Sequence, residues 1–205
     1  ALAEKYDFIY AAVGVHPYDA ETVDDALIEK LKAMAQNKKV VAIGESGLDY
    51  HYEDADFEVQ KQAFIKHIKL ADELDMPIIV HNRDSHKDMM DILTEYRPKN
   101  AIIHCYSGSA EMARELIKLG MYIGIGGVVT FKNAKKLPEV VKMLPDSRIL
   151  LETDAPYLSP EPFRGKLNHS ALIIYVAEKL AEIKNMSVAE VLRITSENTE
   201  KLFNI

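Results

Sequence analysis

The sequence predicts an α/β fold of the TIM-type (β/α)₈ barrel class. Short apolar runs alternate with amphipathic helical segments, and such runs are typical of parallel strands buried on both faces. Polar side chains follow five of these runs, at the strand ends where ligands gather in such folds. A doubly wound open sheet is the main alternative. The barrel is favoured because no Gly-rich dinucleotide fingerprint follows a strand and because the polar residues end five strands instead of marking one switch point.

The apolar runs and the helical periodicity define the expected elements in chain order. Strands are expected over Phe8–Val15, Val40–Gly44, Pro77–Val80, Ala101–Cys105, Tyr122–Gly126 and Ile149–Glu152. Helices are expected over Asp19–Gln36, Asp56–Leu74, Ser85–Tyr96, Ser109–Leu119, Ala134–Met143, Ser170–Lys184, Ser187–Arg193 and Glu197–Phe203. Ser187 and Glu190 form a capping-box pattern at one helix start. All of these elements are expected to form one domain over residues 1–205.

The number of strands is smaller than a complete barrel requires. The chain has 205 residues and six predicted strands, whereas a complete (β/α)₈ barrel typically needs about 250 residues. We therefore expect the first two βα units to be missing from this chain and to precede residue 1.

Composition limits the classes of protein to consider. No apolar stretch approaches the roughly 20 residues that span a bilayer. The single Cys105 excludes an intramolecular disulfide and fits a reducing cytoplasm, and we expect it to be a buried thiol and not a nucleophile. The net charge of −7 argues against a broad nucleic-acid surface but allows a local basic patch. No obligate protein partner is evident.

The residues at the strand ends predict a metal site. His16, Glu45, His81, His104 and Asp154 each close an apolar run. Carboxylate and imidazole ligands without thiolate suit Mg, Mn, Zn, Fe or Ni and exclude a Cys-rich structural zinc site. A bridging carboxylate such as Glu45 could hold two ions, as in sites that clamp the attacking and leaving oxygens of a displacement. A single histidine at a strand end is as readily a core residue. The metal site is predicted because several such histidines and carboxylates occur at equivalent strand ends.

Two arginines are candidates for binding a phosphate. Arg83 follows His81 by two residues, and a guanidinium there could bind a phosphate oxygen or form a rim salt bridge with Asp84. Arg164 and Lys166 lie in the Pro-rich loop after the last strand, where barrels often bind phosphate. A solvated loop is the alternative interpretation.

At these residues the chain resembles the TatD family of metal-dependent deoxyribonucleases, within the amidohydrolase-like barrel superfamily. The matching stretches are GVHP (14–17), GESGLDY (44–50), PIIVHNRD (77–84), HCYSG (104–108), ETDAPYL (152–158) and PEPFRGKLN (160–168). The resemblance implies a phosphodiesterase with two divalent ions (Mg, Mn or Zn) per complete site and exonuclease-like action on DNA.

The resemblance also implies a role for each candidate residue. Glu45 would bridge the ions, His81 and His104 would complete one of them, and Asp154 would ligate the other and orient the attacking water. His16, Arg83 and Arg164 would face the scissile phosphate.

Two departures from the family pattern are visible in the sequence. Family members begin with a strand that carries an H-x-H pair for the second ion, and this chain contains no H-x-H motif. His169 and Ser170 stand where the family usually has an acidic residue and proline after RGKxN. The alternatives to a phosphodiesterase are an amidohydrolase that cleaves C–N or ester bonds and an inactive fragment.

Overall fold

The structure, a computed structural model, describes residues 1–51 and 56–205 and divides into two compact units. Unit 1 comprises Ala1–Ile102 with Leu202–Ile205, and unit 2 comprises Ile103–Lys201. The strands have the order β1-β2-β3-β4-β5-β6, so neighbouring strands follow chain order. Every strand pairing for which a register is defined is parallel. The α/β fold class with parallel strands is therefore confirmed; the eight-stranded barrel, its two further βα units and the single domain remain predictions.

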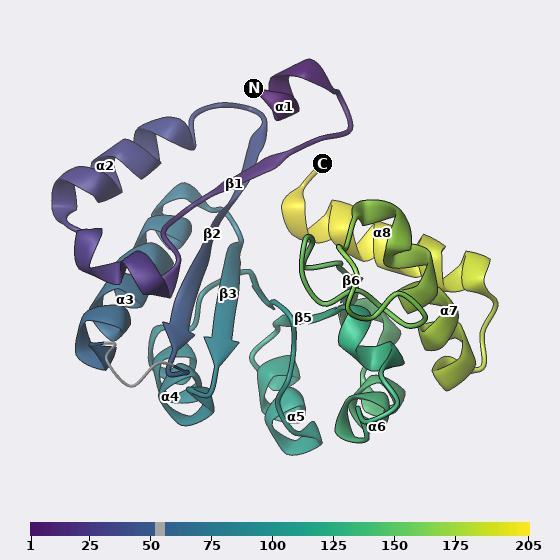
Figure 1. Cartoon of the computed structure of the whole chain (residues 1–205). Helices are drawn as coiled ribbons and strands as arrows, with labels where there is room; N and C mark the ends of the chain where they lie inside the picture. The colour runs from purple at the N-terminus through teal and green to yellow at the C-terminus, as the bar shows by residue number, and fades with distance from the viewer. Residues whose placement is uncertain (52–55) are drawn as a thin grey trace. The chain divides into compact units, whose positions relative to one another are not determined.

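Unit 1 consists of parallel strands with helices packed beside them. Its elements are α1 (Leu2–Lys5), β1 (Ala11–Val13), a 3₁₀ helix (Pro17–Thr22), α2 (Asp25–Met34), β2 (Val40–Asp49), α3 (Phe57–Leu74), β3 (Ile78–Arg83), α4 (His86–Tyr96) and most of β4 (Ala101–Ile103). Helix α3 packs against β2, and α2 packs on α3 (Figure 1). The expected helix over Asp19–Gln36 is divided because Asp24 caps α2 through the Leu27 N–H.

Strand β2 is longer than the sequence predicts. The expected strand ends at Gly44, but the pairing with β3 resumes at Ser46 and continues to Asp49 after a register shift. The polar Ser46 and Asp49 are buried in this extension, which an apolar run alone does not reveal. Gly47 is needed there, because a Cβ atom at this position would lie 2.0 Å from the carbonyl oxygen of His81. Glu45 consequently lies inside β2, at the irregularity, and not at a strand end.

Buried His67 of α3 forms a hydrogen bond with the segment that connects β1 to His16. Its ring is fully buried, Nε2 accepts the N–H of Val15 at 3.1 Å, and Nδ1 lies 2.7 Å from the carbonyl oxygen of Ala63. The two partners assign the proton to Nδ1, so the ring is neutral. Burial lowers the pKa of His67 and favours this neutral form.

Unit 2 repeats the same alternation. Its helices and strands are α5 (Ala110–Lys118), β5 (Tyr122–Ile125), α6 (Lys136–Met143), β6 (Ile149–Leu151), α7 (Ile173–Lys184) and α8 (Val188–Phe203, whose last residues belong to unit 1). Short 3₁₀ helices cover Gly127–Thr130, Asp146–Arg148 and Ser170–Leu172. The two predicted C-terminal helices form the single helix α8, and the Ser187 hydroxyl accepts the N–H of Glu190, as the capping box predicts.

Polar and apolar contacts join the helices of unit 2 to its strands. The Asn198 amide of α8 donates to the carbonyl oxygens of Asp146 and Ile149, which anchors α8 at the start of β6. Helix α7 packs against β6, and α5 packs against β5. Among the residues that the structure describes, no helix is long and apolar enough to cross a membrane.

Candidate functional site

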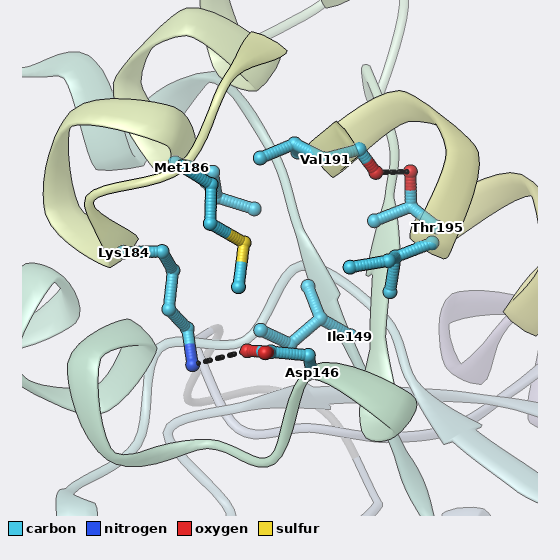
Figure 2. Close-up of a pocket in the computed structure, with 8 residues that line it drawn as sticks. Asp146, Ile149, Lys184, Met186, Val191 and Thr195 are labelled. Carbon is cyan, nitrogen blue, oxygen red and sulfur yellow. Dashed lines mark hydrogen bonds and ion pairs between the residues drawn. The ribbon is translucent and has the colours of Figure 1, made fainter. Parts of the chain in front are cut away.

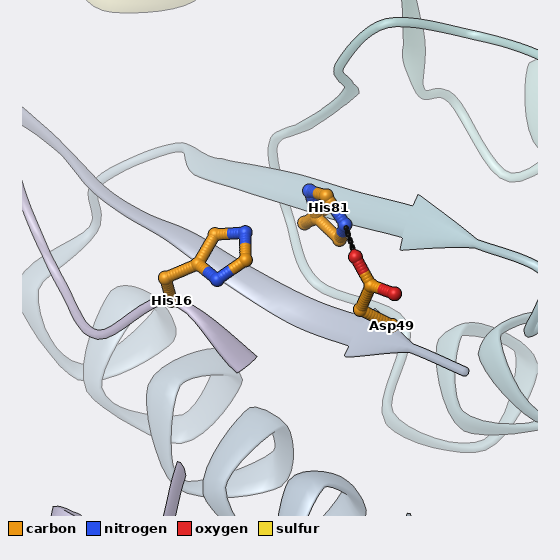
Figure 3. A group of neighbouring side chains, drawn as sticks. All are labelled: His16, Asp49 and His81. Carbon is orange, nitrogen blue, oxygen red and sulfur yellow. Dashed lines mark hydrogen bonds and ion pairs between the residues drawn. The ribbon is translucent and has the colours of Figure 1, made fainter. Parts of the chain in front are cut away.

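The first group of site residues lies in unit 1 and is centred on His81. We define the His81 group as His16, Glu45, Asp49 and His81. The ring of His81, on β3, lies between two carboxylates of β2: Nδ1 is 2.5 Å from Oε1 of Glu45, and Nε2 is 2.9 Å from Oδ2 of Asp49. His16 stacks edge-on against this ring, with centroids 4.6 Å apart. Figure 3 shows His16, Asp49 and His81 facing one another.

Local structure positions each member of the His81 group. Residues on neighbouring strands meet across the sheet, and Gly47 and Asp49 of β2 pair with His81 and Arg83 of β3. The register shift next to Glu45 aims its side chain at His81, as β-bulges near functional sites commonly do. His16 caps the 3₁₀ helix that follows β1 and accepts the Tyr18 N–H at Nδ1.

Asp49 is the buried member of this group and was not among the predicted site residues. Its carboxylate is only 1% exposed and accepts the His51 N–H at 3.0 Å. Burial by itself raises the pKa of Asp49, but hydrogen bonds from the His51 N–H, His81 and Tyr18 outweigh it and lower the pKa overall. The side chain is therefore held ionised against His81. Its position within GLDY (47–50), directly after buried Leu48, is the signal that could have identified it.

The second group lies in unit 2 and is centred on His104. We define the His104 group as His104, Glu152 and Asp154. The ring of His104, one residue after β4, again lies between two carboxylates: Nδ1 is 2.6 Å from Oε2 of Glu152, and Nε2 is 3.3 Å from Oδ1 of Asp154. The other oxygen of Glu152 accepts the Cys105 N–H at 2.6 Å. Unit 2 thus repeats in different elements the arrangement around His81.

Backbone geometry sets up the His104 group. Cys105 and Asp154 have φ values of 45° and 57°, in the left-handed region that costs energy for residues other than glycine. Gly124 leaves room for Glu152, because a Cβ atom there would lie 2.8 Å from Oε2. We expected Cys105 to be a buried thiol, but it is partly exposed. Its backbone turns at the strand end, where its N–H donates to Glu152.

Glu152 is the second residue that the sequence-based prediction of the site missed. It was counted as the last residue of an apolar strand run, but its side chain is 14% exposed and contacts His104. An acidic residue within an apolar strand run is itself the signal that could have identified it, because burying an unpaired carboxylate is costly.

The donor atoms of both groups suit a divalent cation. A neutral imidazole has one N–H and can satisfy only one of two flanking carboxylates, so its other nitrogen lone pair faces a second carboxylate. A cation relieves this repulsion, and imidazole nitrogen with carboxylate oxygen is a ligand set for Zn²⁺ and related ions. His16, Asp49 and His81 offer ligand atoms within 4.8 Å of one another, as do His104, Cys105 and Glu152.

The two predicted phosphate-binding arginines are exposed, each in its own unit. Arg83 donates to the Tyr18 hydroxyl at 3.4 Å, and Asp84, its predicted alternative partner, pairs with His51 instead. Arg164 lies over the ring of Phe131 at 4.3 Å and donates to Asn133 at 3.3 Å. Among the described residues each guanidinium makes one such hydrogen bond, so donors remain from its five N–H groups.

A small hollow elsewhere in unit 2 contains none of the predicted site residues. Apolar side chains of α7, α8 and β6 line it, together with the Lys184–Asp146 ion pair at 2.8 Å (Figure 2). Lys184 also donates to the carbonyl oxygen of Leu144. The hollow lacks the carboxylate–imidazole combination of the two groups above, so the candidate site lies with the histidines.

Comparison with known proteins decides the family. A family model described as "TatD related DNase" matches residues 1–204. The chain belongs to the TatD family. The match begins at residue 1 and gives no support to the predicted loss of an N-terminal H-x-H strand.

Relatives and solved structures agree with this assignment. The chain is 49% identical over its whole length to the uncharacterized metal-dependent hydrolase YabD of Bacillus subtilis and covers 81% of that protein. It is 39% identical to the uncharacterized metal-dependent hydrolase YcfH of Escherichia coli, of which it covers 77%. The crystal structure of YJJV, a TatD homologue from E. coli, has a TM-score of 0.93 at 35% identity and covers 100% of this chain and 80% of that one. The protein is thus a metal-dependent hydrolase of the TatD family.

Proposed function

We propose that this TatD-family hydrolase cleaves phosphodiester bonds and that DNA is its substrate, with exonuclease-like action. The observation that supports the proposal best is the repeated arrangement of one histidine between two carboxylates, at His81 and at His104. The family description, "TatD related DNase", points to the same substrate class.

We assign the metal ligands residue by residue. Glu45 and His81 in unit 1 and His104 and Asp154 in unit 2 are the proposed ligands, and each pair already has its donor atoms in contact or close to it. Divalent ions bound by such ligands polarise a phosphoryl oxygen and lower the pKa of bound water. The preferred ion among Mg²⁺, Mn²⁺ and Zn²⁺, and the binding of two ions per complete site, are part of the proposal to be tested.

The chain's own residues supply the remaining chemistry. Asp154 accepts a proton from the attacking water, because its side chain is 28% exposed and accessible to solvent. Arg83 and Arg164 bind phosphate oxygens through their free donors, and His16, beside His81, orients the substrate. Burial, the largest cause, and nearby His81 lower the pKa of His16, which keeps its ring neutral for this role.

The proposal includes a cytoplasmic location, because the single cysteine fits a reducing compartment. It includes no obligate protein partner, because none is evident from the sequence. The substrate binds locally, because a net charge of −7 repels a polyanion over the rest of the surface.

A cleavage assay tests the proposed substrate. The metal-stripped chain is incubated with end-labelled single- and double-stranded DNA, with RNA of the same sequence, and with an amide and a carboxylic ester substrate, each without metal and with Mg²⁺, Mn²⁺ or Zn²⁺. We expect metal-dependent shortening of DNA from an end, abolished by chelation. Turnover of the amide or ester with no cleavage of nucleic acid would favour the amidohydrolase alternative and refute the proposal.

A further inference from the structure

The strongest feature without an assigned role is a pair of carboxylates, Asp49 and Glu152. Each contacts one ring nitrogen of a site histidine, His81 or His104. Asp49 and Glu152 share one arrangement: one carboxylate oxygen accepts a backbone N–H, and the other bonds a histidine ring nitrogen. For Asp49 the partners are the His51 N–H and His81 Nε2, and the Tyr18 side chain also donates to this carboxylate. For Glu152 they are the Cys105 N–H and His104 Nδ1.

The backbone contacts make these carboxylates fixed acceptors. An ionised carboxylate has no proton to donate, so it forms a hydrogen bond with a histidine nitrogen only if that nitrogen carries the N–H. Each ring also faces a second carboxylate, Glu45 or Asp154, on its other nitrogen. A neutral imidazole has a single proton, so in that form of the ring the two carboxylates compete for it.

In unit 1 the Glu45 contact is the shorter of the two, at 2.5 Å against 2.9 Å for Asp49, so burial must decide this competition. The side chain of Asp49 is 1% exposed, whereas that of Glu45 is 30% exposed. A buried carboxylate loses more when it lacks a hydrogen bond, because water cannot replace the missing donor. The proton of His81 therefore belongs on Nε2, toward Asp49.

Distance and burial agree in unit 2. Glu152 is 14% exposed and 2.6 Å from Nδ1 of His104, whereas Asp154 is 28% exposed and 3.3 Å from Nε2. The proton of His104 therefore belongs on Nδ1, toward Glu152.

We infer that Asp49 and Glu152 are positioning residues that fix opposite ring tautomers, Nε2–H in His81 and Nδ1–H in His104. This leaves Nδ1 of His81 and Nε2 of His104 as the nitrogen atoms that can bind metal. In metal sites, a carboxylate that accepts the other ring N–H sets the orientation of the histidine and raises its basicity as a ligand. The assignment of the metal-binding nitrogen atoms rests on the proposed function, in which the two histidines bind metal. The assignment of the tautomers does not depend on that function.

Amide substitutions test the inference, because the backbone donors fix how the amide must lie. In Glu152→Gln the amide oxygen stays on the Cys105 N–H, so the NH₂ group faces Nδ1 of His104 and forces the proton to Nε2. In Asp49→Asn the oxygen stays on the His51 N–H, and the NH₂ group forces the proton of His81 to Nδ1. Glu178→Gln, on the exposed face of α7, is the matched control.

The primary measurement is the ¹⁵N spectrum of the histidine rings in the metal-free full chain at neutral pH, assigned with His81→Gln and His104→Gln. In the parent we expect Nε2–H for His81 and Nδ1–H for His104. Each amide substitution should switch its own histidine and leave the other unchanged, and the control should switch neither. Zn²⁺ or Mn²⁺ titration should show about 10–100-fold weaker binding for each switched variant.

The outcomes separate this inference from the proposed function. The opposite tautomers or doubly protonated rings in the parent would overturn the inference, even if both amide variants failed to fold. Unswitched rings in well-folded amide variants would overturn it as well. A parent that shows the expected tautomers but binds no Zn²⁺ or Mn²⁺ would refute the proposed metal role and leave the positioning of the two rings established.

Discussion

At the scale of single residues, the proposed chemistry rests on histidines that each face two carboxylates of different burial. Glu45 and Asp154 are the more exposed carboxylates, and Asp49 and Glu152 are the less exposed ones. A carboxylate that remains accessible can exchange protons with water, whereas a buried one serves to orient its neighbour. The exposure of each acid therefore divides the four into two roles.

Asp154→Asn removes the proton acceptor that we assign to the attacking water. Turnover of a phosphodiester substrate should fall about 10²-fold or more, because general base catalysis typically contributes 10²–10⁴-fold. The thermal unfolding curve should be close to that of the parent, since Asp154 is partly exposed. Near-parental turnover in a folded variant would remove Asp154 from the mechanism.

Arg83→Ala and Arg164→Ala should weaken substrate binding without loss of metal. We expect each substitution to raise KM for phosphate-bearing substrates by about 10-fold, the value of a charge-assisted hydrogen bond of roughly 1.5 kcal/mol. Arg193→Ala is the matched control, because Arg193 is an exposed arginine of α8 that pairs with Glu197. Unchanged KM in both variants would make the two arginines ordinary surface residues.

At the scale of secondary-structure elements, strand ends and strand irregularities bring the site residues together. Apolar runs predict where the strands lie, and the observed elements overlap every predicted strand. The extension of β2 could not be predicted from hydropathy, because it buries Ser46 and Asp49 and depends on Gly47 in the register with His81. Asp49 and Glu152 each carry a linear signal, an acid next to buried apolar residues, but the sequence does not show that their partners are His81 and His104, because the contacts join residues far apart in the chain.

The link between α3 and β1 predicts a pH dependence of folding stability. His67 is neutral when folded, and burial lowers its pKa below the ordinary value of 6.5. As pH falls below about 6.5 the unfolded chain takes up a proton on this ring and the folded chain does not, so the stabilisation present above that pH is lost.

Urea unfolding of the parent and His67→Gln at about pH 8 and pH 5.5 measures this effect. The parent should lose more unfolding free energy on acidification than the variant does, by roughly 1 kcal/mol, because one proton changes stability by at most about 1.4 kcal/mol per pH unit. Equal losses in the two proteins would show that His67 does not control the pH response.

At the scale of the whole molecule, the proposed substrate is a polyanion and the chain itself is acidic. A net charge of −7 gives no general attraction for DNA. Affinity must then come from local groups, namely the arginines and the bound divalent ions, and should depend on those ions more than on overall charge. A dependence of DNA affinity on divalent ions requires residues that can bind these ions. The histidine–carboxylate arrangement, which occurs in unit 1 and again in unit 2, provides such residues.

The most direct test of the central claim is the metal content of the folded chain. Metal-stripped parent, Glu45→Ala, His104→Ala and the control Glu178→Ala are equilibrated with Mn²⁺ or Zn²⁺, separated from free ion by gel filtration and analysed by mass spectrometry of the elements. We predict bound ion in the parent and the control, less in His104→Ala and least in Glu45→Ala, the proposed bridging ligand. Equal metal content in Glu45→Ala and the parent would contradict the account.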